Sequence, residues 1–298
     1  MRDNHGRTSP VEHGFPHLET VRASLTALFR RLTADGIRAY AASITPAEAA
    51  FGPAEDLHLG AHRVASAVVR ALRLPDARMV VSFRPMQDAA TVELAAGPEY
   101  FVEVNDRFRV HRRDLAAALA HEVTHVLLHR LDLGFPATAD NEILTDTAAA
   151  FLGSGWLLLD AYREDALTHQ KLGYLTPEEF GYVLARRARF FGEDPAPWFT
   201  SPQAYEAYVR GHALAGREEL RAPLAAAARA QRRRYARARR AGAAPARGAA
   251  YRFGRDGDGE LRVSFPCPVC GQWLRVPAGG GVLRVRCGLC RTVLECDT

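Results

Sequence analysis

The stretch His121-Glu122-Val123-Thr124-His125 combines two imidazoles and a carboxylate at a spacing that suits metal chemistry. Residues four apart on a helix project from the same face, so His121 and His125 can reach one zinc ion. Glu122 lies beside them, where its carboxylate can take a proton from a water that the metal has made more acidic. Because the surrounding residues have helical periodicity, the pattern predicts a zinc site on a helix.

Hydrolytic zinc also needs a third protein ligand and an open coordination position. The stretch Asn141-Glu142-Ile143-Leu144-Thr145-Asp146 offers Glu142 as that ligand on the following helix. Asp146 lies four residues on, on the same helix face, where it could accept the second ring N–H of a ligand histidine. The residues alone therefore offer Glu142 as one candidate for the third ligand, with Glu122 as the general base.

The order HExxH followed by Asn-Glu-x-x-Thr-Asp resembles the signature of the thermolysin-like gluzincins, a family of zinc metallopeptidases, over residues 100–159. The resemblance implies that Glu142 binds zinc, that Asp146 orients His121 and that Glu122 is the catalytic base. It also implies a zincin-like domain, of the compact type, that hydrolyses peptide bonds. The chain is similar, in addition, to bacterial proteins with an HExxH helix, and this second likeness implies no further chemistry.

In the gluzincins a histidine or tyrosine from a later domain steadies the tetrahedral oxyanion, and that domain has no recognisable counterpart here. The candidates for this role are the later tyrosines and histidines Tyr162, His169, Tyr174, Tyr182 and His212. The family binds its substrate against the edge strand of the sheet. The candidate edge strand consists of residues 100–104, with Tyr100, Val102 and Val104.

Four of the five cysteines form two CxxC pairs near the end of the sequence, Cys267 with Cys270 and Cys287 with Cys290. Four thiolates at this spacing are typical of a closed tetrahedral zinc site. The segment is similar to a zinc ribbon whose hairpin strands are residues 272–276 and 282–286, and it is expected to fold only with metal. Cys296 is expected to be a bystander thiol. The sequence thus predicts two zinc ions, one catalytic and one structural.

Arginine carries almost all of the positive charge, and eight arginines lie between Arg229 and Arg247. The ribbon adds four more arginines and an aromatic side chain, Arg275, Arg284, Arg286, Arg291 and Trp273. These residues could bind nucleic acid. Equally, they could be solvated surface, or the ribbon could hold a protein partner.

Helical periodicity and capping residues predict the elements that must position these groups. Helices are expected over residues 18–32, from Thr45-Pro46, over residues 57–74, after a cap at Asp114, and from a cap at Asp140 to about residue 160. Thr176-Pro177-Glu178-Glu179 predicts a capping box for a helix that ends at Gly192, and Ser201-Pro202 begins another. Short strands are expected over residues 79–83, 91–94 and 100–104.

The chain of 298 residues, 48% of them hydrophobic, is long enough for one sizeable core and a smaller module. We expect an α+β fold with a disordered segment over residues 1–17, a zincin-like domain over 18–223, an Arg/Ala-rich helix and linker over 224–250, and a zinc ribbon over 251–298. No stretch is apolar and long enough to span a bilayer, and residues 1–17 are polar, so a cytoplasmic location is expected.

The residues and the resemblance together predict a zinc metallopeptidase with a ribbon that recruits a substrate or partner. One alternative is a SprT-like protease that acts on DNA-bound proteins, although the third metal ligand of that family is a later histidine. Another alternative is a catalytically inactive zinc-binding adaptor for nucleic acid or protein.

Overall fold

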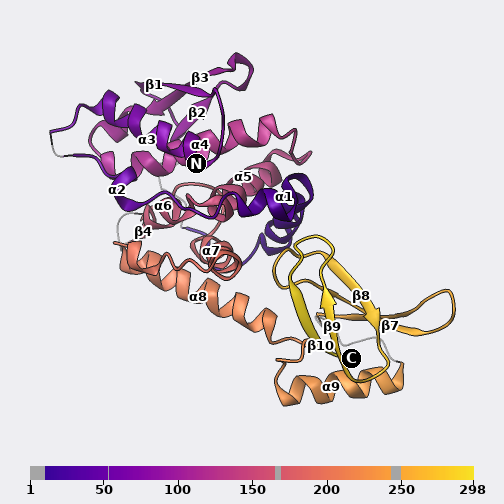
Figure 1. Ribbon diagram of the computed structural model, residues 1–298. Helices are drawn as coiled ribbons and strands as arrows, with labels where there is room; N and C mark the ends of the chain where they lie inside the picture. The colour runs from indigo at the N-terminus through magenta and orange to yellow at the C-terminus, as the bar shows by residue number, and fades with distance from the viewer. Residues whose placement is uncertain (1–10, 53, 165–168, 243–249) are drawn as a thin grey trace.

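The computed structural model describes residues 11–52, 54–164, 169–242 and 250–298 (Figure 1). Within these residues the protein is α+β, as predicted, with nine α-helices, small sheets and a strand-rich C-terminal part. The helices are α1 (Leu18–Arg38), α2 (Pro46–Ala49), α3 (Leu57–Ala71), α4 (Leu115–Arg130), α5 (Thr138–Leu152), α6 (Gly155–Asp160), α7 (Pro177–Phe191), α8 (Pro202–Glu219) and α9 (Arg229–Ala241). The strands are β1 (Arg78–Arg84), β2 (Ala90–Val92), β3 (Glu99–Asn105), β4 (Arg163–Glu164), β5 (His169–Gln170), β6 (Arg252–Arg255), β7 (Leu261–Pro266), β8 (Trp273–Pro277), β9 (Val282–Arg286) and β10 (Val293–Asp297). None of the helices in the described ranges is long and apolar enough to cross a membrane.

The three-stranded sheet of the larger part has the strand order β1-β3-β2. β1 runs parallel to β3, with Met79 opposite Tyr100, and β2 pairs with β3 in antiparallel fashion, with Ala90 opposite Val104. The strand that contains Tyr100, Val102 and Val104 is therefore central, and its prediction as the edge strand is wrong. These three side chains are buried, and the backbone of β3 is hydrogen-bonded to β1 on one side and to β2 on the other. The edge strand that contacts α4 is β2.

The helices predicted to carry the metal ligands are α4 and α5, which pack against each other (Figure 1). Their first turns differ from the prediction. Asp114 does not cap α4, because its carboxylate accepts hydrogen bonds from Arg163 and Gln170. α5 begins at Thr138, so Asp140 lies inside the first turn, where its negative charge still favours the helix dipole.

The single helix predicted to run to about residue 160 is divided into α5 and α6. Gly153 ends α5 with a φ of +116°, which favours glycine. A Cβ at this position would lie 3.0 Å from the carbonyl oxygen of Ala42 and from the Cα of Ser43. The break therefore lets the loop before α2 pack closely on the end of α5.

The limits of α7 and the start of α8 agree with the prediction. The hydroxyl of Thr176 accepts the backbone N–H of Glu179, and the Glu179 carboxylate accepts the backbone N–H of Thr176. α7 ends at Gly192 in the left-handed conformation. The hydroxyl of Ser201 caps α8 by accepting the N–H of Ala204.

Residues 11–17 lie against the start of α7, so their predicted disorder is wrong. The side chain of His13 is hydrogen-bonded to Glu178, and the backbone N–H of His17 donates to Glu179. Both carboxylates belong to the capping turn of α7, whose polar groups attract the segment. Residues 1–10 lie outside the described part of the chain.

The C-terminal part contains two sheets, β6-β7-β8 and β9-β10. The predicted strands exist as β8 and β9, but they do not form one hairpin. β8 pairs with β7, and β9 pairs with β10, because each CxxC knuckle folds its own flanking strands together. The N–H of Cys267 donates to the carbonyl of Gln272, and the N–H of Cys287 donates to that of Thr292.

The Arg/Ala-rich helix α9 begins at Arg229 rather than at residue 224. Leu224 forms an isolated bridge with Cys296, so the chain passes along the C-terminal strands before the helix starts. The buried ring of Tyr235 packs against Tyr251. α9 is therefore attached to the strands of the C-terminal part.

The first cysteine knuckle touches α1. The hydroxyl of Thr26 donates to the carbonyl of Cys270 at 2.7 Å, and the guanidinium of Arg30 donates to the side chain of Gln272 at 3.1 Å. Gly271 lies at the closest approach, with a φ of +75°, and a Cβ there would lie 2.9 Å from the hydroxyl of Thr26. Glycine after the second cysteine thus permits the knuckle to lie directly on the helix.

Candidate metal centres

His121 and His125 on α4 meet Glu142 from the first turns of α5. The Nε2 atoms of the two histidines are 3.1 Å apart. The Oε2 atom of Glu142 lies 3.2 Å from Nε2 of His121 and 3.3 Å from Nε2 of His125. The three ligand atoms predicted from the sequence therefore converge on one point.

The distances between these three atoms can be compared with those around a metal ion. Tetrahedral zinc with bonds of about 2.0–2.2 Å holds neighbouring ligand atoms about 3.3–3.6 Å apart. The observed 3.1–3.3 Å is close to that spacing. The group could hold a metal ion such as zinc, and three protein ligands leave a fourth position for water or substrate.

The fully buried carboxylate of Asp146 orients His121. One oxygen accepts the Nδ1–H of His121 at 2.8 Å, and the other accepts the backbone N–H groups of Tyr174 and Leu175. Gly173 makes this loop possible, because its φ is +81° and a Cβ there would lie 2.6 Å from the carboxylate. With the proton held on Nδ1, the Nε2 lone pair is free for a metal.

Thr145 orients His125 in a similar way, and the sequence did not reveal this role. Its hydroxyl donates to the carbonyl of Asn141 at 3.0 Å and lies 3.3 Å from Nδ1 of His125. Since the hydroxyl proton is used, the oxygen accepts the ring N–H. Thr145 lies within the signature, but helical threonines commonly bond to their own backbone, so only the structure shows the contact with His125.

The charges of the site favour a bound cation. Burial alone would lower the pKa of His121, but the hydrogen bond and the charge of Asp146 outweigh it and raise that pKa well above its usual value. Burial would raise the pKa of Glu142, but its hydrogen bonds with His121 and His125 lower it to about 2. An ionised carboxylate thus faces the Nε2 atoms of both histidines, and its negative charge favours a cation between them.

Glu122 lies next to the ligands and is buried. Burial raises the pKa of its carboxyl group, against the opposing positive charges of His121 and His125. Asp88, which precedes β2, adds a smaller upward contribution and was not recognised from the sequence. A carboxyl group with a raised pKa is better suited to accept and return a proton.

The structure brings one of the oxyanion candidates, Tyr174, to the metal ligands. Its ring centroid lies 6.4 Å from that of His121, with the two planes 26° apart. The side chain is 54% exposed, so its hydroxyl can meet a substrate. Burial and the negative charges of Glu142 and Asp88 raise the pKa of Tyr174, which keeps the hydroxyl protonated as a hydrogen-bond donor.

The other candidates have different neighbours. The buried hydroxyl of Tyr182 donates to Glu218, that of Tyr162 donates to Glu164, and the ring of His212 on α8 lies beside Tyr208. His169 belongs to β5, and its side chain lies outside what the structure describes.

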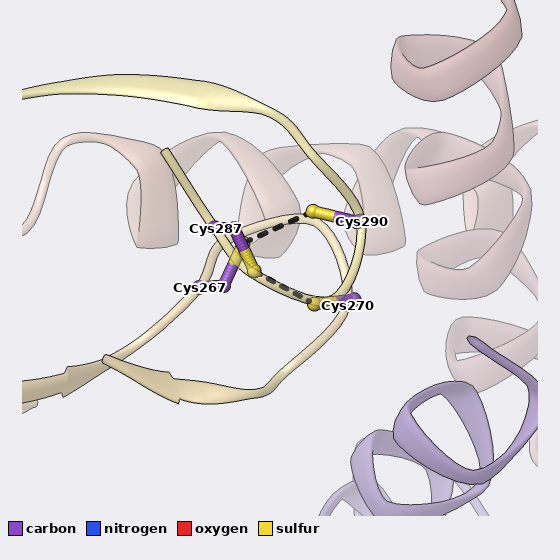
Figure 2. A group of neighbouring side chains, drawn as sticks. All are labelled: Cys267, Cys270, Cys287 and Cys290. Carbon is purple, nitrogen blue, oxygen red and sulfur yellow. Dashed lines mark hydrogen bonds between the residues drawn. The ribbon is translucent and has the colours of Figure 1, made fainter. Parts of the chain in front are cut away.

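The four ribbon cysteines gather as predicted (Figure 2). The Sγ atoms of Cys267 and Cys290 are 3.6 Å apart, as are those of Cys270 and Cys287. A disulfide would need about 2.05 Å. Tetrahedral zinc with bonds of about 2.3 Å separates neighbouring sulfurs by about 3.8 Å. The buried cluster could therefore hold a metal ion, and its dimensions are consistent with zinc.

Electrostatics in the sulfur cluster also favour a cation. The neighbouring thiols and burial raise the pKa of Cys270 far above its usual value, because several thiolates repel one another at this distance. A divalent cation removes that repulsion. Cys296 is buried as well, but it lies outside the four-cysteine group, and burial raises its pKa to about 11.

Comparison with known proteins identifies no relative: no protein-family model, no curated protein and no solved structure matches the chain. The interpretation of the two centres therefore depends on their own residues and geometry. The resemblance to the gluzincins stays a prediction carried by the signature residues.

Proposed function

We propose that the chain is a zinc-dependent peptidase of gluzincin type, with one catalytic and one structural zinc ion. The observation that carries the proposal is the convergence of three ligand atoms 3.1–3.3 Å apart, from His121, His125 and Glu142, beside the buried carboxyl group of Glu122. Metal-assisted hydrolysis requires this combination of a three-ligand open site and an adjacent base.

His121, His125 and Glu142 would hold the catalytic ion. Zinc in such a site lowers the pKa of water to about 7 and polarises a carbonyl group. Glu122 accepts the proton of the attacking water and delivers it to the leaving amine, for which its raised pKa is suitable. Asp146 holds His121 in the tautomer that this arrangement needs.

Two further features would position a peptide. β2 is the edge strand beside α4, and an extended peptide can pair with such an edge through its backbone. The exposed ring of Tyr174 lies beside that of His121, and its hydroxyl would donate to the oxyanion.

The identity of the third ligand distinguishes this proposal from a SprT-like protease. Among the described residues, the ligand group around His121 and His125 is completed by Glu142 rather than by a histidine. A catalytically inactive adaptor would keep the same ligands, so the two possibilities differ in activity and not in metal content.

The decisive test is the variant Glu122→Gln. We expect it to keep two zinc ions per chain, measured by elemental analysis, and to lose cleavage of a broad peptide mixture by at least about 10²-fold, measured by mass spectrometry. Glu19→Gln, at an exposed position on α1, is the matched control and should cleave normally. Undiminished cleavage by Glu122→Gln would contradict the mechanism, and a zinc-loaded wild type that cleaves nothing would favour the adaptor.

A further inference from the structure

A groove of about 1050 Å³ lies between the helical part and the C-terminal part. Its lining residues come from α1, α7 and the end of α8 on the helical side, and from the first cysteine knuckle with β6, β7 and β8 on the other. Figure 1 shows α1 and the end of α8 beside the C-terminal strands. Arginine dominates its charged lining, which includes Arg22, Arg30, Arg31, Arg186, Arg221 and Arg252. The peptidase proposal gives this surface no role.

The groove has a surplus of positive charge. Its six arginines face two carboxylates, those of Glu19 and Glu218. The carboxylate of Glu218 is shared among three arginines: it pairs with Arg22 and Arg186, and its Oε1 atom lies 3.8 Å from Nη1 of Arg221. No carboxylate within the described ranges pairs with Arg31 or Arg252. A concave surface lined by charge of one sign concentrates ions of the opposite sign, so the expected occupant is an anion.

Arg186 is a buried member of this lining and carries positive charge that its neighbours compensate only in part. Its side chain is only 4% exposed, yet its Nε and Nη1 groups have no hydrogen-bond partner among the described residues. The remaining nitrogen, Nη2, donates to Tyr182 and Glu218. Because both nitrogens are themselves buried, a groove ligand does not bond to them directly, but the charge of Arg186, which shares Glu218 with Arg22, adds to the positive field of the groove.

Trp273 indicates which kind of anion the groove suits. Its side chain is 45% exposed, and the guanidinium of Arg252 lies 4.8 Å from the ring centroid. Exposed aromatic rings and arginine planes are stacking surfaces for unpaired bases. The volume of about 1050 Å³ is at the upper end of the usual range of small-ligand pockets, about 300–1000 Å³, so the groove has room for an extended ligand. An acidic peptide would use the arginines but would have no use for the flat aromatic surface.

We propose that this groove binds single-stranded nucleic acid, with phosphates held by the groove arginines and a base stacked on Trp273. The peptidase chemistry is not required for this interaction. Five arginines of α9 are also exposed, Arg229, Arg233, Arg234, Arg237 and Arg240. They add attraction at longer range on the same C-terminal part, but they do not form the groove.

The test uses the full zinc-loaded chain and a fluorescein-labelled oligothymidylate of about ten nucleotides, with binding measured by anisotropy. Affinity should fall steeply between about 50 and 200 mM salt. Arg31→Gln and Arg252→Gln should each weaken binding. Each should also reduce the slope of log affinity against log salt concentration by about one, because one phosphate contact is lost. Trp273→Ala should weaken binding about five- to a hundredfold, and Trp273→Phe should restore most of it.

Arg78→Gln is the matched control, because Arg78 is exposed on β1, outside the groove, and should bind as the wild type does. Glu122→Gln should also bind normally, so failure of the peptidase proposal can be told apart from failure of this one. The inference would be overturned if the oligonucleotide showed no salt-dependent binding, or if Arg233→Gln abolished binding while the groove variants did not. It would also be overturned if polyglutamate competed as well as the oligonucleotide and Trp273→Ala had no effect.

Discussion

At His121 and His125, one nitrogen of each ring is engaged by an acceptor from α5 and the other faces Glu142. Asp146 and Thr145 are those acceptors. Both rings are thereby held in the tautomer that presents Nε2 to a metal ion. Adjacent residues on one helix thus orient both histidines, which couples the geometry of the ligands to the packing of α4 on α5.

Asp146→Asn should weaken binding of the catalytic zinc about 10- to 100-fold. The carboxylate accepts from His121 on one oxygen and from two backbone N–H groups on the other, and an amide must direct its NH₂ group at one of these donors. Chelator competition followed by elemental analysis measures the affinity. The exposed Asp132→Asn is the control, and an unchanged affinity in Asp146→Asn would refute the orienting role.

Tyr174→Phe should lower kcat by about 10²–10³-fold while leaving KM and zinc content nearly unchanged. The reason is that the hydroxyl would act on charge that develops in the transition state, whereas the ring contact with His121 survives the change. Steady-state kinetics on a cleaved peptide measures the effect. Full activity in this variant would assign the oxyanion to another donor.

Among the elements, α1, α7 and α8 are joined by one ionic cluster. Glu218 of α8 accepts hydrogen bonds from Arg22 of α1 and from Arg186 and Tyr182 of α7. Burial would raise the pKa of Glu218, but the charges of Arg186 and Arg22 outweigh it and lower the pKa below its usual value. The ionised form is thus favoured by folding, and the cluster stabilises the protein while Glu218 stays charged.

Glu218→Gln should destabilise the protein at neutral pH by about 3–5 kcal/mol, because it leaves Arg186 buried without its carboxylate. A lowered folded-state pKa means that the contribution is complete above the unfolded value of 4.5 and disappears as pH falls through the folded value. The difference in unfolding free energy between the two proteins should therefore shrink in acid. Urea unfolding of both proteins at neutral and at acidic pH measures this difference. A difference that does not change with pH would contradict the ionic explanation.

In the whole molecule, the sulfur cluster supports more than the ribbon. The carbonyl of Cys270 accepts a hydrogen bond from Thr26 of α1, and the same knuckle lines the arginine groove. Folding of the hairpins around a metal would therefore place the C-terminal part against the helical part. This connects the four-cysteine cluster to the proposed nucleic-acid site but not to the proposed peptidase site.

Cys270→Ser should lower the zinc content from two ions to one and expose the backbone of residues 251–298 to hydrogen exchange, because we expect this segment to depend on metal for its stability. Oligonucleotide binding should be lost, and peptide cleavage should persist. Elemental analysis and exchange mass spectrometry measure the outcome. Cys296→Ala should keep both ions, and retention of two ions in Cys270→Ser would disprove the four-sulfur site.

The sequence by itself determined the groups that converge over short distances along the chain. His121 and His125 share a helix face because of the helical repeat, and each CxxC pair lies in one tight knuckle. Local geometry also determined the capping box at Thr176. These features depend on a few neighbouring residues, so their spacing predicts them.

Only the tertiary structure decided the features that depend on distant pairing. It made β3 central rather than an edge, brought the loop of Tyr174 to Asp146, and opened the groove between α1 and the ribbon. The order of the strands and the path of the loop depend on which surfaces are buried against each other. The residues that form these surfaces are far apart in sequence, so local spacing does not predict them. The two groups of candidate metal ligands were thus predictable, whereas the strand order, the returning loop and the groove around them were not.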